Sequence, residues 1–232
     1  MRSNDRRLVW DLPLRLFHWL FAAGILACWG TAQLGFAWMR WHMWLGYCIM
    51  GLLFFRLIWG FIGPKHARFI GFLKSPSAVL NYARGLAGVG VVVRSVGHNP
   101  LGGLMVIVML MLVAVQVYTG LFSTDDITWS GPYNGTVSDA TAERLTGLHH
   151  LNSNFIWSAI GLHLAAIIYY AFVKKENLVP AMLTGRKPAE AVPVDQAITG
   201  SELWKAAIVI AICGGAVYWI LTAAPAASSS VL

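Results

Sequence analysis

Four histidines associated with apolar segments are the residues of this chain whose type and spacing could do chemistry. They are His18, His42, His149 and His163. An ionisable side chain inside a membrane-length segment is costly and usually marks a functional site. A structural histidine that satisfies only a local hydrogen bond remains the alternative for each one alone. Together the four form a pattern that separate structural roles do not explain.

The spacing of His149 and His163 places them on one helix face. Fourteen residues separate them in the sequence. In a helix this step rises about 21 Å and turns about 1400°, which is within about 40° of four full turns. His150 points about 140° away from His163 by the same geometry. His149 is therefore predicted to face inward, and His150 to contact a neighbouring helix or the outer surface.

The depths of the four histidines pair them across a helix bundle. With the first segment starting on the cytoplasmic side, His18 and His163 share an inner level, and His42 and His149 share an outer level. Two imidazoles at each level are the axial ligands that two b-type haems need, and helix bundles build such sites from facing side chains. Zinc would require four converging ligands. The sequence predicts two haem b groups whose iron ligands are these two pairs.

Further side chains are predicted to hold the haem groups. Arg56 lies fourteen residues after His42 and therefore at the depth of the inner haem, where a propionate would neutralise its charge. Snorkelling to the membrane interface is the alternative for Arg15 and Arg56. The residues predicted to bind propionates are Arg15, Arg56 and Arg144. Gly46 is predicted to let the macrocycle approach the backbone closely.

Five apolar segments are long enough to position these residues across a bilayer. Hydrophobic residues make up 57% of the 232-residue chain and charged residues only 12%, against roughly 25% charged in soluble domains. A span needs about 20 mostly apolar residues. The qualifying stretches are 14–34, 42–62, 101–122, 153–173 and 203–223. The fold class predicted is an all-α membrane protein with a four-helix diheme bundle and a fifth, C-terminal transmembrane helix. A cleaved signal peptide is the alternative for the first stretch.

Basic residues concentrate on one side of these spans. The leader, the connection between spans two and three and the connection between spans four and five are basic, with Arg2 and Arg94 among their charges. The loop after span three is acidic. Since basic loops stay in the cytoplasm, the N-terminus is predicted to be cytoplasmic and the C-terminus periplasmic. The net charge of +7 then reflects topology and contact with anionic membrane lipid, not nucleic acid.

Three regions follow from this organisation. Residues 1–188 are predicted to form the diheme domain, 189–202 a cytoplasmic linker, and 203–232 the fifth helix with a short outer tail. Between spans two and three, "SPSAVLNYARGL" predicts an amphipathic surface helix capped by Ser75. The acidic outer loop "STDDITWSGPYNGTVSD" is rich in turn residues, and with Trp129 it could form a docking surface.

The chain resembles the bacterial cytochrome b-561 family that includes the b-type cytochrome subunit of nickel–iron hydrogenases. The matching stretches extend from about residue 8 to residue 188 and are "VWDLPLRLFHW", "HMWLGYCIMGLLFFRLIWGFIGP", "GHNPLGGLMVIVML", "LHHLNSNFIWSAIGLHLAA" and "KENLVPAMLTGRK". The resemblance implies a four-helix diheme cytochrome of the bacterial inner membrane, with the same four histidine ligands. It also implies electron exchange between a periplasmic partner and membrane quinone.

The resemblance also bears on His98 and His150. In "GHNPLGG", His98 stands at the cytoplasmic start of span three, where it could contact a propionate or take part in a quinone site. A plain helix-start role is the alternative. The second position of "LHH", here His150, is commonly acidic in relatives, and the fifth span lies beyond the resemblance.

The function predicted from these observations is transmembrane electron transfer through two bis-histidine b-type haems. It would link the quinone pool to a periplasmic c-type cytochrome, hydrogenase or dehydrogenase subunit, so the chain would be an electron-transfer subunit and not a stand-alone enzyme. One alternative is a self-sufficient membrane quinone oxidoreductase that acts on a small outer-side redox molecule. Another is a proton or metal transporter, a class that usually shows intramembrane acids.

Overall fold

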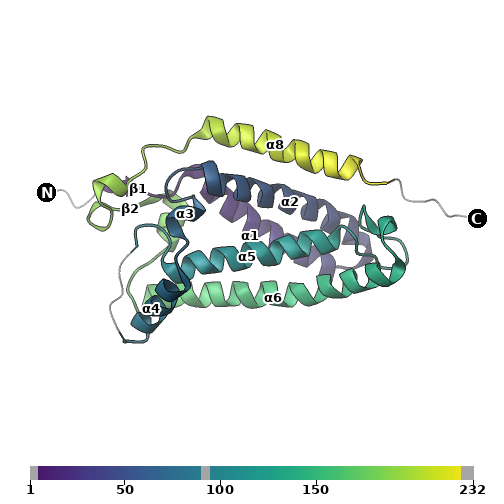
Figure 1. Cartoon of the computed structure of the whole chain (residues 1–232), viewed down its shortest axis with the longest axis horizontal. Helices are drawn as coiled ribbons and strands as arrows, with labels where there is room; N and C mark the ends of the chain where they lie inside the picture. Colours follow the sequence, from purple (N-terminus) through teal and green to yellow (C-terminus); the bar gives the residue numbers. More distant parts are fainter. Residues whose placement is uncertain (1–4, 90–94, 226–232) are drawn as a thin grey trace, which may run out of the picture. The chain divides into compact units, whose positions relative to one another are not determined.

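The computed structural model describes residues 5–89 and 95–225, and five long helices dominate it (Figure 1). Arg2 and Arg94, which contribute to the predicted charge asymmetry, and residues 226–232 of the predicted outer tail lie outside the described residues. The five helices are α1 Leu12–Gln33, α2 Met39–Ile62, α5 Pro100–Gly120, α6 Asp139–Phe172 and α8 Leu203–Thr222. Each is long and apolar enough to cross a membrane, which confirms the five spans and the all-helical membrane class.

The fourth span is longer than the sequence pattern indicates. Helix α6 begins at Asp139, whereas the apolar stretch begins at residue 153. The additional turns, "DATAERLTGL", are polar but rich in helix-forming residues, and Asp139 places a negative charge in the first turn, where the helix dipole favours it. A criterion based on apolar residues alone misses such turns. Because α6 begins at Asp139, His149 lies well inside the helix.

Short elements connect the spans. They are the 3₁₀ turn Phe36–Trp38, α3 Phe69–Phe72, α4 Pro76–Leu86, the 3₁₀ turn Asn134–Thr136, α7 Val179–Thr184 and the 3₁₀ turns Ala189–Ala191 and Val194–Gln196. The predicted cap of α4 is confirmed, because the Ser75 hydroxyl accepts a hydrogen bond from the Ala78 N–H at 3.3 Å. Helix α7 ends at Thr184, and the next residue, Gly185, has a φ of 80°, a left-handed value that suits glycine.

A two-stranded antiparallel sheet joins the N-terminus to the segment after α7. Strand β1, Arg6–Leu8, pairs with β2, Arg186–Pro188, with Arg7 opposite Lys187. The following segment continues this attachment, because the Ile198 N–H donates to the Leu8 carbonyl at 2.9 Å. The predicted linker is therefore ordered against the N-terminal strand over part of its length.

The chain forms two compact units. Unit 1 comprises residues 1–18, 56–109 and 159–207, and unit 2 comprises residues 19–55, 110–158 and 208–232. The core of unit 1 includes Val9 and Trp59, which are fully buried. Many large apolar side chains on the helices remain exposed, for example Phe61 and Ile210. Such exposure fits helices that face lipid, since contact with hydrocarbon chains carries no hydrophobic penalty.

Candidate haem-binding site

In unit 2, the imidazoles of His42 on α2 and His149 on α6 form a close pair. Their ring centroids lie 6.2 Å apart, with an angle of 78° between the planes. Two metal–nitrogen bonds of about 2.0 Å and two imidazole radii of about 1.1 Å, placed end to end, span about 6.2 Å. The observed separation matches this sum, and it also lies within the range of ordinary ring contacts.

Hydrogen bonds at Nδ1 orient both rings of this pair. His42 Nδ1 lies 2.8 Å from the Cys28 carbonyl oxygen, and His149 Nδ1 lies 3.1 Å from both the Gln116 carbonyl oxygen and the Thr119 hydroxyl. A carbonyl acceptor keeps the proton on Nδ1 and leaves the lone pair on Nε2. Both rings can therefore offer Nε2 to a metal, which is the arrangement usual for histidine ligands.

Two glycines lie near this pair, one beside the His149 ring and one a turn after His42. A Cβ added to Gly120 would lie 3.0 Å from Cε1 of His149, so a glycine on α5 allows the ring to sit there. A Cβ at Gly46, one turn after His42, would meet no atom within 4 Å. The open space at Gly46 fits the predicted approach of a macrocycle to the α2 backbone.

Asn152 links α6 to α5 one turn after His149. It is 4% exposed, and its amide donates to the Leu112 carbonyl at 2.8 Å and to Gln116 Oε1 at 2.7 Å. A buried amide with both donors used holds the two helices in one register. The Gln116 carbonyl that orients His149 is therefore fixed by a neighbouring buried hydrogen bond.

In unit 1, His18 on α1 and His163 on α6 form the second pair. Their ring centroids lie 6.4 Å apart, with 53° between the planes, a separation close to the one calculated for two imidazoles that share a metal ion. Within residues 5–89 and 95–225, no group of three or more His, Cys, Asp or Glu side chains gathers at a metal-binding distance. A haem iron needs only axial ligands from the protein, because the porphyrin supplies the others.

Arg56 is a buried cation of unit 1 whose side chain fits a haem propionate. It is 2% exposed, and neither of its terminal nitrogens has a hydrogen-bond partner among the described residues. The guanidinium carbon lies 4.6 Å from the centroid of the Phe69 ring and 5.9 Å from that of Phe72. A buried charge without hydrogen bonds is unfavourable, and a carboxylate would accept from both nitrogens.

His98 lies between two aromatic rings of the same unit. Its ring centroid is 4.8 Å from that of Trp10 and 4.6 Å from that of Phe72. Its Nδ1 is buried and has no hydrogen-bond partner in the described part of the chain, although the residue as a whole keeps some exposure. Burial, with a smaller effect of the nearby Arg56 charge, lowers the pKa of His98 to about 3. The imidazole is therefore neutral and offers one nitrogen to a further group.

The remaining predicted residues have other surroundings. The Arg15 guanidinium donates to the Leu183 carbonyl at the end of α7, while its Nε is buried and lacks a partner within residues 5–89 and 95–225. Arg144 is exposed on α6. His150 is also exposed, with its ring centroid 6.2 Å from that of His149 and the planes at 85°. The roles of these three residues stay predictions.

Several supporting side chains escaped the sequence analysis. Asp11 is 1% exposed, and its Oδ1 accepts hydrogen bonds from the Leu14 N–H at 2.9 Å and from Trp59 Nε1 at 3.0 Å. Thr119 and Asn152 are buried polar residues near His149. The available signal was their polarity within or beside apolar spans, since such groups must find partners in the protein.

The helices define a multi-span membrane protein, and the paired imidazoles are its candidate haem ligands. A family model described as "Prokaryotic cytochrome b561" matches residues 9–185, and the chain belongs to this family. It is therefore a bacterial membrane cytochrome of the b type, and its function is transmembrane electron transfer by b-type haem. The comparison with curated proteins found no match, and the comparison with solved structures also found none.

Proposed function

We propose that two bis-histidine haems carry the electrons, one bound by His18 and His163 and one by His42 and His149. The observation that carries this proposal is the separation of the ring centroids, 6.4 Å and 6.2 Å, in two pairs that each join different helices. Each bound haem supplies a one-electron redox centre. The two histidines of each pair would hold the iron, and with both ligand positions used the group would supply electron transfer and not oxygen binding.

The surrounding residues orient the ligands and balance charge. The Cys28 and Gln116 carbonyls hold the protons on Nδ1 of His42 and His149, which raises the basicity of the ligating nitrogens. Arg56 donates to a propionate of the inner haem. Neutral His98 offers its free nitrogen to a propionate or to a quinone at the same end of the protein.

The proposed path of electrons joins a periplasmic redox partner to the membrane quinone pool. The partner would be a c-type cytochrome or a hydrogenase or dehydrogenase subunit. The distribution of basic residues supports a cytoplasmic N-terminus and a periplasmic C-terminus. The acidic loop after α5 supports a docking role on the periplasmic side, because charged surfaces steer the association of redox proteins.

Haem content tests the number of redox centres. The purified chain should show a reduced low-spin b-type spectrum and two haems per chain. His149→Ala should retain one haem, whereas the matched variant His150→Ala should retain both, because His150 is exposed. One haem in the unaltered protein, or loss of haem from His150→Ala alone, would contradict the assignment.

Electron transfer to quinone needs a separate measurement. In liposomes, the reduced protein should be oxidised by a soluble quinone analogue at a rate that falls when His98 is replaced by leucine. The haem spectrum should remain that of the unaltered protein. Equal oxidation rates in both proteins would restrict His98 to a structural or propionate role.

A further inference from the structure

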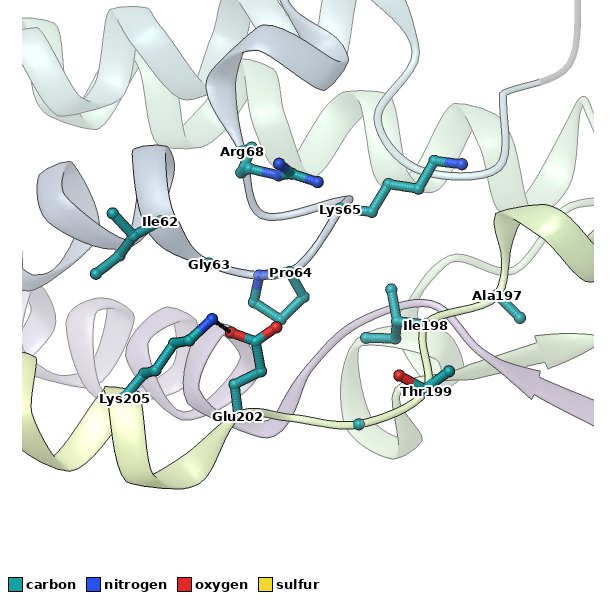
Figure 2. Close-up of a pocket in the computed structure, with 11 residues that line it drawn as sticks. Ile62, Gly63, Pro64, Lys65, Arg68, Ala197, Ile198, Thr199, Glu202 and Lys205 are labelled. Carbon is teal, nitrogen blue, oxygen red and sulfur yellow. Dashed lines mark ion pairs between the residues drawn. The ribbon is translucent and has the colours of Figure 1, made fainter.

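A cavity of about 300 Å³ in unit 1 lies between the turn that ends α2 and the segment that leads into α8. Figure 2 shows the lining residues: Pro64 and Arg68 come from the segment after α2, and Ile198, Glu202 and Lys205 come from the segment that leads into α8 and its first turn. The haem-binding residues discussed above do not line it.

The charges that line the cavity are mainly positive. Lys65, Arg68 and Lys205 face a single carboxylate, that of Glu202. Lys205 Nζ lies 2.6 Å from Glu202 Oε2, so these two charges form an ion pair. Lys65 Nζ donates to a neutral acceptor, the Asp195 carbonyl oxygen, at 3.1 Å. With three positive charges and one negative charge, the lining has a net charge of +2.

The Asp195 carboxylate does not line the cavity. Its Oδ2 accepts a hydrogen bond from Gln196 Nε2 at 2.9 Å. Arg68 and Lys65 are exposed and can reach a ligand at the opening of the cavity. An anion is the ligand that this distribution of charge favours.

The position and the apolar lining of the cavity select the kind of anion. Ile62 is the last residue of α2, and Leu203 is the first residue of α8, so the cavity lies where two membrane spans end. Ile62, Pro64 and Ile198 give it apolar surface beside the cations. A phospholipid at this depth has a charged phosphodiester next to glycerol and apolar acyl chains, which matches cations beside an apolar surface.

We propose that this cavity binds the headgroup of an anionic phospholipid. The phosphodiester contacts Arg68 and Lys65, and the glycerol end lies against Pro64 and Ile198. The Glu202 carboxylate opposes the anion and limits its affinity. The bound lipid joins the α2–α3 turn to the segment before α8. This role is independent of the haem ligation and of the direction of electron flow.

The test is a lipid titration of the full-length holoprotein in neutral detergent, followed by native mass spectrometry. The probe is phosphatidylglycerol. A cation near an anionic lipid surface contributes about 1 kcal/mol, which corresponds to about a fivefold change in affinity. Arg68→Gln should therefore bind the lipid about fivefold more weakly, and Glu202→Gln about fivefold more tightly. Arg84→Gln, which removes an exposed charge of α4 outside the cavity, should bind as the unaltered protein does.

Parallel titrations distinguish a lipid from other sources of the same chemistry. Phosphatidylcholine should bind more weakly than phosphatidylglycerol, and inorganic phosphate at equal concentration should not displace the lipid. Displacement by inorganic phosphate would make the cavity a site for free phosphate and would overturn the proposal, as would equal binding of the two lipids.

Arg68→Gln and Glu202→Gln have opposite expected effects, so the proposal can be tested even if one of them does not fold. Haem absorbance and circular dichroism establish that each variant is folded. If Arg68→Gln does not fold, Glu202→Gln still decides, because tighter binding supports the proposal and unchanged or weaker binding contradicts it. Loss of one haem would leave these lipid affinities unchanged, so failure of the haem assignment and failure of lipid binding remain distinguishable.

Discussion

Replacing Arg56 with methionine should leave the stability of the apoprotein unchanged or raise it, and should lower the affinity for the inner haem. The guanidinium is 2% exposed, and its terminal nitrogens have no hydrogen bonds to the described residues. A buried charge without hydrogen bonds carries a desolvation cost, and an apolar side chain of similar volume avoids that cost. The apoprotein of Arg56→Met is therefore expected to unfold at the same temperature as the unaltered apoprotein or at a higher one.

The haem-bound protein should respond in the opposite way. If Arg56 binds a propionate, each charge-assisted hydrogen bond would contribute about 1.5–3 kcal/mol. Two terminal nitrogens then account for about 3–6 kcal/mol, which is about two to four orders of magnitude in haem affinity. Arg56→Lys keeps the charge but loses the planar pair of donors, so its affinity should be intermediate.

The assay uses the His149→Ala background, which should hold only the inner haem. Transfer of haem to an excess of apomyoglobin reports its retention, and circular dichroism of the apoproteins reports thermal stability. Arg84→Met, which alters an exposed arginine of α4, is the control and should retain haem normally. Retention of haem by Arg56→Met equal to that of the control would refute the propionate contact. Stacking on Phe69 would then be the role of Arg56.

Two further outcomes are expected in unit 2. In Gly120→Ala, the new Cβ would lie 3.0 Å from the His149 ring, whereas the new Cβ of Gly147→Ala would meet no atom within 4 Å. Overpacking costs about 1–3 kcal/mol, so Gly120→Ala should retain the outer haem less well. Gly147→Ala should retain it normally, as measured by haem transfer. Backbone hydrogen bonds, first that from the Thr128 N–H, lower the pKa of Asp125 from 3.8. The ionised carboxylate therefore stabilises the loop above about pH 3.8, and this stabilisation is lost as the pH falls through the lowered pKa. Asp125→Asn should remove that pH dependence of amide hydrogen exchange, and an unchanged profile would contradict it.

The spans and the helical class were predictable because they depend on local composition. About 20 apolar residues in succession form a signal that neighbouring helices do not alter. The early start of α6 at Asp139 was missed, since its first turns are polar and become recognisable only through helix propensity and the charge at the helix start.

The histidine pairs could be proposed from sequence because a helix fixes both depth and face. The structure places the rings of each pair 6.2 Å or 6.4 Å apart, and the ligand roles stay predictions. The partners of His149 on α5, Gln116 and Thr119, could not be predicted. They depend on how α5 is rotated against α6, and periodicity within one helix carries no information about that rotation.

The surroundings of Arg56 were hidden for a related reason. Its contact with Phe69 depends on the path of the chain after α2 ends, where a short turn and α3 return over the helix. Turns of this kind follow from a few residues and from tertiary contacts. The charge could therefore be placed in a span from the sequence, but the rings beside it could not be identified.

The pairing of β1 with β2 has a consequence for biosynthesis. Arg6 lies opposite Pro188, so the second residue of the pair leaves the ribosome about 180 residues after the first. At about 5–20 residues per second, the N-terminal strand waits on the order of ten to forty seconds for its partner. Its main-chain donors and acceptors must meanwhile be satisfied by water or by the insertion machinery. A chain released before Pro188 lacks the partner strand and cannot form this pair.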